Sequence, residues 1–530
     1  MPYIPLRKIG AGGLVPDQNA YDVELTQFEN GNNVAFENGV IGKSLGETDV
    51  GITIPTKPVA VAGFFDAGAN NIFIGARNDI YRYNGSSVTT VTRSAGAYSN
   101  STRWQTEQIG SGMIFNNGSD VPQYISESVI SANGNFADLT NWPSALRTES
   151  VKPYKSFLVM TGYTESGNTY KTRVRWSDEF DPSTVPDDYD TTSATTLAGF
   201  TELGGENGDL LDQLTLGNTH IIYAERGVYA MDFIGAPFVF SFRELFSDEG
   251  IISKGACASW EGKHLVVGEN DIYVHDGSTK KSVADLRVRN EFYKSLIDTE
   301  SVFCKSVPSR SEVWIFYAVQ GADQDATDTK YSPNKCLIYN WTNNAFTFRD
   351  ITNLRDANHA DTMPQGGTDG TWSSGDLLNY DASTEWWSNS SFGAEASELG
   401  FFAVDHTNSK LLLLNNSRGF AGSNINSFVE TTKVDLDNVL GTANNNIKQI
   451  NGIMPQMKGE GNVVISVGFS NTPTDSTTWS QIKTYNLQSD HKIDVRISGR
   501  YLALRFESNE NTNYWTLSGL DIDVKEVASR

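Results

Sequence analysis

The chain has 530 residues, of which 41 are Lys or Arg and 64 are Asp or Glu, so its formal net charge is −23 with His neutral. An apolar fraction of 38% and an aromatic fraction of 11% are enough for a sizeable core, which excludes disorder over most of the chain. The acidity argues against a surface that binds DNA or membranes generally, because both are polyanions. It leaves open a protein that contacts DNA without holding it.

Targeting and membrane-spanning segments are not expected. The longest apolar runs, such as Phe233 to Phe242, have the length of a strand, whereas a membrane-spanning helix needs roughly 20 residues. The N-terminal segment lacks the apolar stretch and cleavage pattern of a secretory signal. Cys257, Cys304 and Cys336 lie far apart without metal-ligand spacing. We therefore expect buried thiols in a protein that is made in a cytoplasm and not exported.

Short β-type segments, separated by Gly, Asn, Asp and Ser, dominate the chain from its beginning. Residues 1–50 contain a predicted hairpin across Asn38-Gly39, a dipeptide that favours two-residue turns. Apolar residues recur with helical spacing in Ser282 to Ile297, which predicts a helix there. The pattern as a whole predicts an all-β protein.

An internal repeat begins after residue 50: an apolar strand, a polar turn, and a second strand that carries Tyr or Trp. Asn71 to Gly85 resembles Lys263 to Gly277 position by position. Six copies are marked by aromatic residues spaced 43, 52, 53, 44 and 66 residues apart: Tyr81, Tyr124, Trp176, Tyr229, Tyr273 and Tyr339. Because propeller blades of four strands repeat every ~40–50 residues, the copies predict a six-bladed β-propeller. Phe401 to Asn416 supplies either a seventh copy or a strand that closes the ring.

The remaining segments complete the predicted domain organisation. We place the propeller at 51–440, with insertions at the acidic, turn-rich segment 181–213 and the polar segment 355–400. From 441 to 530 the strands become longer and alternate between apolar and polar residues, as in Ile493, Val495 and Ile497. This alternation is typical of a half-buried antiparallel sheet, so we expect a C-terminal β-sandwich.

Several segments, taken in order, resemble the tail nozzle proteins of short-tailed bacteriophages, also called tail tubular or DNA-stabilisation proteins. GAGGLVPD and GNNVAFENGVIGKSLGE resemble the N-terminal signature of that family, and VRWSDEFDP through IIYAERGVYAMDFIGAPFVFSF resembles its central region. RISGRYLALRFES and LSGLDIDVK resemble its C-terminal domain. The resemblance implies a six-bladed propeller whose N-terminal segment (1–50) and C-terminal segment (441–530) join into one platform domain.

The resemblance also implies partners and a location. Six copies would form a homo-hexameric ring at the distal end of the virion tail, below the head-to-tail adaptor protein and assembled in the host cytoplasm. Tail fibres would dock on the outside. Viral double-stranded DNA would pass transiently, without sequence specificity, through an axial channel that loops close until host contact.

No catalytic centre is recognisable, so we expect neither enzyme activity nor a cofactor or a metal. Two fragments of the Asp-box turn of sialidases, at 368–372 and 474–479, are out of phase with the blades. The six histidines are scattered. His264 and His275 lie on adjacent predicted strands of one blade, where they could approach each other, and we interpret them as structural residues.

One acidic segment could bind calcium. Asp323, Asp325 and Asp328 are spaced like the ligands of a calcium loop, but the segment lacks the Gly and the closing Glu of an EF-hand. A solvated hairpin tip is the favoured interpretation.

Three groups of residues are candidates for intermolecular contacts. The acidic loop with Asp187, Asp188 and Asp190 either lines a channel as a gate loop or is simply solvated. Trp386 and Trp387 either stack on a sugar ring or are buried at an interface for a subunit or a fibre. A basic stretch either steers DNA or contacts an acidic neighbouring subunit, and the net charge of −23 favours the second interpretation. The stretch contains Lys280, Lys281, Arg287, Arg289 and Lys294.

The sequence therefore predicts a structural component of a phage tail, a gated nozzle for genome retention and ejection. A channel wall of the same sign as DNA would let the genome slide rather than adsorb. The alternative is a receptor- or carbohydrate-binding propeller of a tail fibre or adhesin, which would normally be trimeric.

Overall fold

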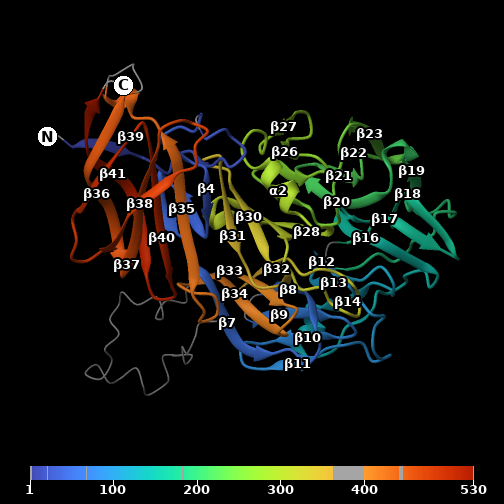
Figure 1. The fold of residues 1–530 in the computed structure, drawn as a ribbon. Coiled ribbons are helices and arrows are strands. Elements are labelled where there is room, and N and C mark those ends of the chain that lie inside the picture. Colours follow the sequence, from blue (N-terminus) through green and yellow to red (C-terminus); the bar gives the residue numbers. More distant parts are fainter. Residues whose placement is uncertain are drawn as a thin grey trace, which may run out of the picture.

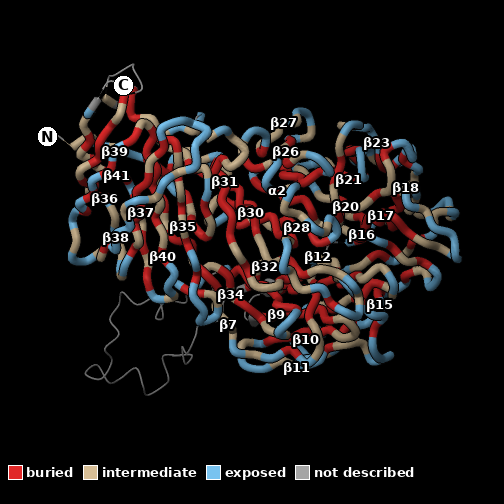
Figure 2. The backbone as a smooth tube through the Cα atoms, in the orientation of Figure 1, coloured by how far each residue is buried: buried red, intermediate tan, exposed pale blue. Residues whose placement is uncertain are grey.

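The computed structural model describes residues 3–20, 22–66, 69–181, 184–361, 399–440 and 446–528. Its strands form two packed parts, a β-propeller and a β-sandwich, which lie side by side (Figure 1). Buried residues run through the middle of the sheets, and exposed residues concentrate in the connecting loops and at the outer edges (Figure 2). An all-β fold with a propeller and a sandwich is therefore confirmed.

The propeller consists of seven antiparallel sheets of four strands, and in blades 1 to 6 the strands follow one another along the chain from the inner to the outer edge. Blade 1 contains β8 (Pro58–Asp66), β9 (Ala69–Ala76), β10 (Ile80–Tyr83) and β11 (Val88–Thr90); blade 2 contains β12 (Gln105–Ile109), β13 (Gly112–Asn116), β14 (Gln123–Ser126) and β15 (Ala137–Asp138). Blade 3 contains β16 (Leu146–Tyr154), β17 (Phe157–Glu165), β18 (Asn168–Trp176) and β19 (Gly199–Glu202); blade 4 contains β20 (Leu210–Leu216), β21 (Thr219–Ala224), β22 (Val228–Gly235) and β23 (Val239–Phe246). Blade 5 contains β24 (Cys257–Trp260), β25 (Lys263–Val267), β26 (Ile272–His275) and β27 (Lys280–Ser282); blade 6 contains β28 (Asp298–Val307), β29 (Glu312–Ala318), β30 (Lys335–Asn340) and β31 (Ala345–Asp350). Blade 7 contains β32 (Leu354–Asp361), β33 (Leu399–Asp405), β34 (Lys410–Ser417) and β7 (Gly46–Thr53).

The ring is closed by the N-terminal strand β7, which pairs with β34 as the outer strand of blade 7. The inner strands contact one another in order around the ring, and β32 of blade 7 contacts β8 of blade 1. The predicted number of six blades is therefore wrong, and the ring has seven. Each of the six aromatic markers lies in the third strand of its blade, but in blade 7 this strand carries leucines instead.

The sandwich combines both ends of the chain. One sheet has the order β39 (Ile493–Gly499), β36 (Ile447–Glu460), β41 (Tyr514–Ala528), β6 (Val40–Lys43) and β5 (Val34–Glu37), and β1 (Ile4–Arg7) also pairs with β41. The other has the order β38 (Thr478–Asn486), β37 (Asn462–Ser470), β40 (Tyr501–Glu510), β35 (Ile425–Val434) and β4 (Asn30–Asn32). Along β39 buried and exposed residues alternate as the sequence predicts, because successive side chains of a strand point to opposite faces.

The strands do not respect the expected domain borders at 50 and 440. β7 crosses residue 50 and belongs to the propeller, whereas β35 precedes residue 440 and belongs to the sandwich. The segment 181–213 contains β19 and the start of β20, and the segment 355–400 contains most of β32. Both segments thus supply blade strands in addition to connections.

The sandwich packs against the outer strand of blade 6. The Asn33 N–H donates to the carbonyl of Phe348 (2.8 Å), and the Thr347 hydroxyl donates to the carbonyl of Val34 (2.6 Å). One continuous hydrophobic cluster extends from the sandwich into blades 4, 5 and 6. The two parts therefore pack together through one shared hydrophobic core.

Helices are few and short: α1 (Glu127–Ser131), α2 (Arg289–Ser295) and α3 (Asp437–Leu440). The helix predicted for Ser282 to Ile297 is confined to α2, because Leu286 adopts a left-handed backbone conformation (φ 57°) that interrupts a right-handed helix. The Asp17 carboxylate then accepts the N–H groups of Asn290 (2.6 Å) and Glu291 (3.0 Å) at the start of α2. In the part of the chain that the structure describes, none of the helices is long and apolar enough to cross a membrane.

Candidate functional site

The axis of the propeller is lined by charged side chains from the inner strands. Lys152 on β16 contacts Glu107 on β12 (Nζ–Oε1 3.2 Å) and Asp212 on β20 (Nζ–Oδ1 3.8 Å). The second carboxylate oxygen of Asp212 accepts the N–H of Gly255, which immediately precedes β24 (2.8 Å). This chain of contacts links blades 2, 3, 4 and 5.

A second chain of contacts links the remaining blades. Lys305 on β28 contacts Asp356 on β32 (Nζ–Oδ1 3.2 Å). The other carboxylate oxygen of Asp356 accepts the N–H of Val61 on β8 (3.1 Å). The two chains together contact all seven blades, so polar contacts at the axis join the inner strands within each of these two groups of blades.

These pairs are charged despite their burial. Burial by itself disfavours charge on Lys152, but the attraction of Glu107 and Asp212 outweighs it and raises the pKa of Lys152. Burial likewise disfavours a charged Asp212, yet Lys152 and the N–H donors of Gln213 and Gly255 lower the pKa of this carboxyl group. The inner wall therefore consists of fixed charges of both signs.

Arg103 crosses the axis of the ring. It precedes β12 of blade 2, and its guanidinium reaches Gly255 before blade 5, where an added Cβ would lie 2.5 Å from Nη2. The same guanidinium lies 5.9 Å from the ring centroid of Phe303 in blade 6. Blades 5 and 6 stand opposite blade 2 in a ring of seven. A single arginine side chain thus spans the axial opening, which is far too narrow for a DNA duplex.

A cavity of about 760 Å³ opens at one end of this axis. Its deeper wall includes the buried residues Ser253 and Phe303, together with Arg103. Its rim carries exposed carboxylates, among them Glu225 and Glu269. Because the cavity gathers charged and hydroxyl side chains from several blades, we treat it as the candidate binding site.

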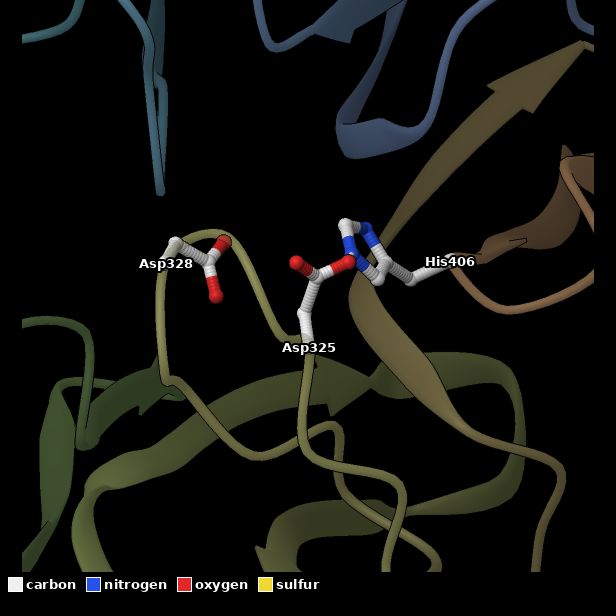
Figure 3. Close-up of side chains that lie close together, drawn as sticks. All are labelled: Asp325, Asp328 and His406. Atoms are coloured by element: carbon white, nitrogen blue, oxygen red, sulfur yellow. Dashed lines mark hydrogen bonds and ion pairs between the residues drawn. The ribbon is translucent and has the colours of Figure 1, made fainter.

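A buried cluster of charges lies beside the cavity, on the loop between β29 and β30. Asp325 and Asp328 of this loop lie near His406, which follows β33 (Figure 3). Asp325 contacts Lys57 (Oδ2–Nζ 2.6 Å), His406 (Oδ2–Nε2 3.0 Å) and Arg77. The carboxylate side chains of Asp325 and Asp328 are each only 1% exposed, so the favoured interpretation as a solvated hairpin tip is wrong.

The cluster ties blade 6 to both of its successors in the ring. Arg77 follows β9 of blade 1 and lies 3.1 Å from Oδ2 of Asp328 (measured from Nη2). Arg355 on β32 of blade 7 lies 3.2 Å from Oδ1 of the same carboxylate (measured from Nη2). Lys57, Arg77 and Arg355 therefore reach the loop of blade 6 from blades 1 and 7.

The geometry of this cluster does not favour a metal ion. Ligand atoms of Asp325, Asp328 and His406 lie within 4.8 Å of one another. Three cationic side chains, however, already contact the two carboxylates, and they lower the pKa of Asp325 even though burial opposes this. A divalent cation would have to displace these partners. We assign the cluster to the closure of the ring.

His264 and His275 do approach each other, as their register on β25 and β26 predicts. The Gly277 N–H donates to His275 Nδ1 (3.2 Å), and His275 Nε2 lies 2.7 Å from the Tyr223 hydroxyl. That hydroxyl lies 2.7 Å from His264 Nδ1, and His264 Nε2 lies 3.1 Å from the carbonyl of Thr215. Two neutral rings satisfy every one of these contacts.

Burial gives these rings low pKa values. It lowers the pKa of His264 to about 3 and that of His275 to about 4. The Tyr223 hydroxyl joins blade 4 to blade 5 through both rings. A structural role accounts for every contact of the pair.

The predicted gate residues lie in the loop between β18 and β19. Asp187 and Asp190 are exposed, and the side chain of Asp190 accepts the N–H and hydroxyl of Thr192 (2.8 Å and 2.7 Å). The Asp188 carboxylate accepts the N–H of Asp190 (2.8 Å). Between them, Tyr189 is buried against Trp142. The loop is thus anchored by an aromatic residue and presents its carboxylates to solvent.

The basic stretch is brought together at β27 and the turn before α2. Lys280 contacts Asp248 (Nζ–Oδ2 2.9 Å), and Arg289 contacts Asp285 (Nη2–Oδ1 3.0 Å). Arg287 donates to the carbonyl of Asn344. Lys281 is exposed. Of the predicted cations, Lys280 and Arg289 are therefore neutralised within the chain.

Two predicted residues, Trp386 and Trp387, lie outside the described residues, as does the Asp-box fragment at 368–372. The thiols of Cys257, Cys304 and Cys336 are free and buried, as predicted.

The axial charges were missed in the sequence, although a signal for them exists. Glu107, Lys152, Asp212, Lys305 and Asp356 recur at intervals of 45, 60, 93 and 51 residues, which correspond to one, one, two and one blade. A charged residue that returns with the blade period inside a strand marks the polar axis of a propeller.

Comparison with known proteins finds no matching family model and no matching curated protein. Among solved structures, the chain is similar to the Neurospora crassa Pan2 WD40 domain, with 8% identity and a TM-score of 0.36 over 71% of this chain and 95% of that chain. It is also similar to the RRP9 WD40 repeats, with 9% identity and a TM-score of 0.39 over 70% and 99% of the two chains. A computationally designed protein, Ika8, gives 10% identity and a TM-score of 0.35 over 70% and 99%. Similarities this distant carry no information about function.

Proposed function

We propose that this chain is a structural protein of a short-tailed phage tail, a nozzle subunit that assembles into a hexameric ring around the path of the genome. The observation that carries the proposal is the joining of both chain ends into one domain beside a propeller. From the N-terminal segment, β1 and β6 pair with β41 and β4 pairs with β35, both from the C-terminal part, while β5 pairs with β6. The resemblance in sequence implies this arrangement of a platform domain.

The channel for DNA would lie between copies and not within one copy. Arg103 and the charged pairs fill the axis of the propeller, so a single chain offers no passage. A ring of copies would enclose a wider opening. The net charge of −23 supports weak adsorption of DNA to such a wall, because like charges repel.

An exposed apolar hairpin tip supports assembly with other copies. At the end of β22, Phe233 and Ile234 are about half exposed, and Phe238 in the turn before β23 is 76% exposed. Large apolar side chains that gather on a surface indicate an interface, because their exposure to water is unfavourable. We propose this tip as a contact between neighbouring subunits.

The test is the oligomeric state of the full-length protein, measured by native mass spectrometry and by electron microscopy of isolated particles and of virions. Sixfold rings on the tail axis are expected. Phe238→Ser should weaken the rings without unfolding the subunit, and Ile482→Ser is the matched control, since Ile482 is 66% exposed on the sandwich. The proposal would be refuted if the protein showed threefold symmetry on the virion or were absent from the tail axis.

The second candidate function is a binding propeller on a fibre or adhesin. The axial cavity of about 760 Å³ is the observation that favours it, since propellers offer ligands a site where several blades converge. Trimeric assembly, together with a ligand that protects the cavity residues, would support this alternative over the nozzle.

A further inference from the structure

Arg103 is a cation without a counterion, held inside the axial cavity. In the part of the chain that the structure describes, its guanidinium makes neither an ion pair nor a hydrogen bond. The contact that it does make is with the ring of Phe303, 5.9 Å from the centroid. Burial lowers the pKa of Arg103, although the charges of Asp356 and Asp212 act to raise it. These two carboxylates contact Lys305 and Lys152, and not Arg103, directly. Arg103 is half-buried, and a partly buried charge without a partner is unfavourable.

The surroundings of Arg103 keep space open for a partner. Gly255 lies opposite the guanidinium, and any side chain there would collide with it, since a Cβ would be 2.5 Å from Nη2. Gly255 also has a φ of 80°, which favours glycine. The buried residue Ser253 and the exposed residue Thr102 line the same cavity. The guanidinium therefore faces an open, polar space in which a planar oxyanion can accept two of its N–H groups.

The rim of the cavity carries charges of both signs. Lys254 pairs with Glu149 (Nζ–Oε2 2.9 Å), and Lys330 pairs with Glu300. Glu225 and Glu269 line the same cavity, are exposed, and form no ion pair with any residue in the described ranges. Arg226, next to Glu225, is exposed on the same rim. A ligand that reaches Arg103 can therefore also meet two carboxylates that have no ion-pair partner.

We propose that the axial cavity binds a small zwitterionic ligand of the amino-acid or short-peptide class, with its carboxylate on Arg103 and its ammonium group toward Glu225 and Glu269. Phosphate has no ammonium group for the carboxylates of Glu225 and Glu269, which repel its negative charge instead. The site lies inside one propeller, so it does not depend on the assembly proposed above. An experiment that refutes the nozzle function would leave this ligand site untouched, and an experiment that refutes the ligand site would leave the nozzle function untouched.

The experiment uses the full-length protein with three probes: glycylglycine, its C-terminal amide, and inorganic phosphate. Calorimetry and the thermal midpoint report binding. Glycylglycine should bind saturably and raise the midpoint, whereas the amide and phosphate should do neither. Arg103→Gln should weaken binding of glycylglycine by about tenfold or more, which is the usual loss for a charge-assisted pair. Arg496→Gln is the matched control, because Arg496 is an exposed arginine on β39 of the sandwich and does not line the cavity, and it should change binding by less than about twofold.

A stability measurement separates a ligand site from a structural role. Without ligand, Arg103→Gln should melt at the same temperature as the wild-type protein or at a higher one, because it removes an uncompensated charge. Arg103→Lys, which keeps the charge but not the two-pronged donor, should bind glycylglycine at an intermediate level. Equal binding by Arg103→Gln and wild type, no saturable binding of glycylglycine, preference for phosphate, or a lower melting temperature of ligand-free Arg103→Gln would each overturn the proposal.

Discussion

Tyr223 connects two blades through one hydroxyl, so Tyr223→Phe tests how the blades are held together. The hydroxyl donates to Nδ1 of His264 and accepts from Nε2 of His275, both at 2.7 Å. All three side chains are at most 1% exposed. The substitution removes a single oxygen and keeps the ring, so the apolar packing of β21 is unchanged.

The expected cost follows from the groups that are left behind. Without the hydroxyl, one ring nitrogen has no donor and the other N–H has no acceptor. Each buried, unsatisfied group costs roughly 1–3 kcal/mol, so the two groups together should cost about 2–6 kcal/mol in the free energy of unfolding. With an unfolding entropy of about 1.1 kcal/mol/K for a chain of this length, the thermal midpoint should fall by roughly 2–5 °C.

The assay is thermal unfolding at pH 7.5, followed by calorimetry and by far-ultraviolet circular dichroism. Tyr83→Phe is the control: its hydroxyl donates to the carbonyl of Gly85 (2.9 Å) at the edge of a turn, where water replaces the lost contact. The control should lower the midpoint by less than about 1 °C. A Tyr223→Phe protein as stable as the wild type would refute the assignment of the hydroxyl as the shared partner of both rings.

Three further predictions concern the closed ring. Because burial holds the pKa of His220 and His264 near 3 and that of His275 near 4, below the value of about 6.5 in the unfolded chain, stability should be complete above about pH 6.5 and decline as the pH falls toward 4. Each ring contributes about 1.4 kcal/mol per pH unit in that window, and midpoints that are equal at pH 7.5 and 5.0 would contradict this. Asp325→Asn should cost about 3–5 kcal/mol in urea unfolding, because it removes the carboxylate that pairs with Lys57 and Arg77 of blade 1, whereas unchanged stability would contradict a role of these pairs in closing the ring. Gly46→Ala should cost about 1–3 kcal/mol and expose the join of β7 to proteolysis, since a Cβ at Gly46 would lie 2.0 Å from the carbonyl oxygen of Gly419; cleavage at the wild-type rate would count against this.

The repeat, the strand types and the two-part architecture could be read from the sequence because they depend on local pattern. The aromatic markers from Tyr81 to Tyr339 all lie in third strands, where a large side chain packs between neighbouring blades. Alternation along Ile493–Gly499 predicts one buried face, and the structure shows it. The turn at Asn38-Gly39 takes the positive φ values of 52° and 78° that this dipeptide favours.

The repeat left the seventh blade undecided: Phe401 to Asn416, offered as a seventh copy or a closing strand, lies in β33 and β34 of that blade. Its inner strand, Leu354–Asp361, carries the polar residues Arg355, Asp356 and Asn358 because it faces the charged axis and the buried cluster of blade 6. An apolar pattern therefore does not mark it. Its outer strand comes from residues 46–53, more than 300 positions earlier, and only chain closure brings that strand to β34.

The sequence by itself thus determined the all-β class, the propeller period, the buried thiols and the alternating sandwich strands, since each depends on residues that are neighbours along the chain. Tertiary structure alone decided the number of blades, the burial of Asp325 and Asp328, and the position of Arg103 across the axis. Each of these depends on partners contributed by distant blades: Arg77 and Arg355 for the two carboxylates, and Gly255 for Arg103. Such pairings are set by the closure of the ring, which brings the inner strands together around one axis.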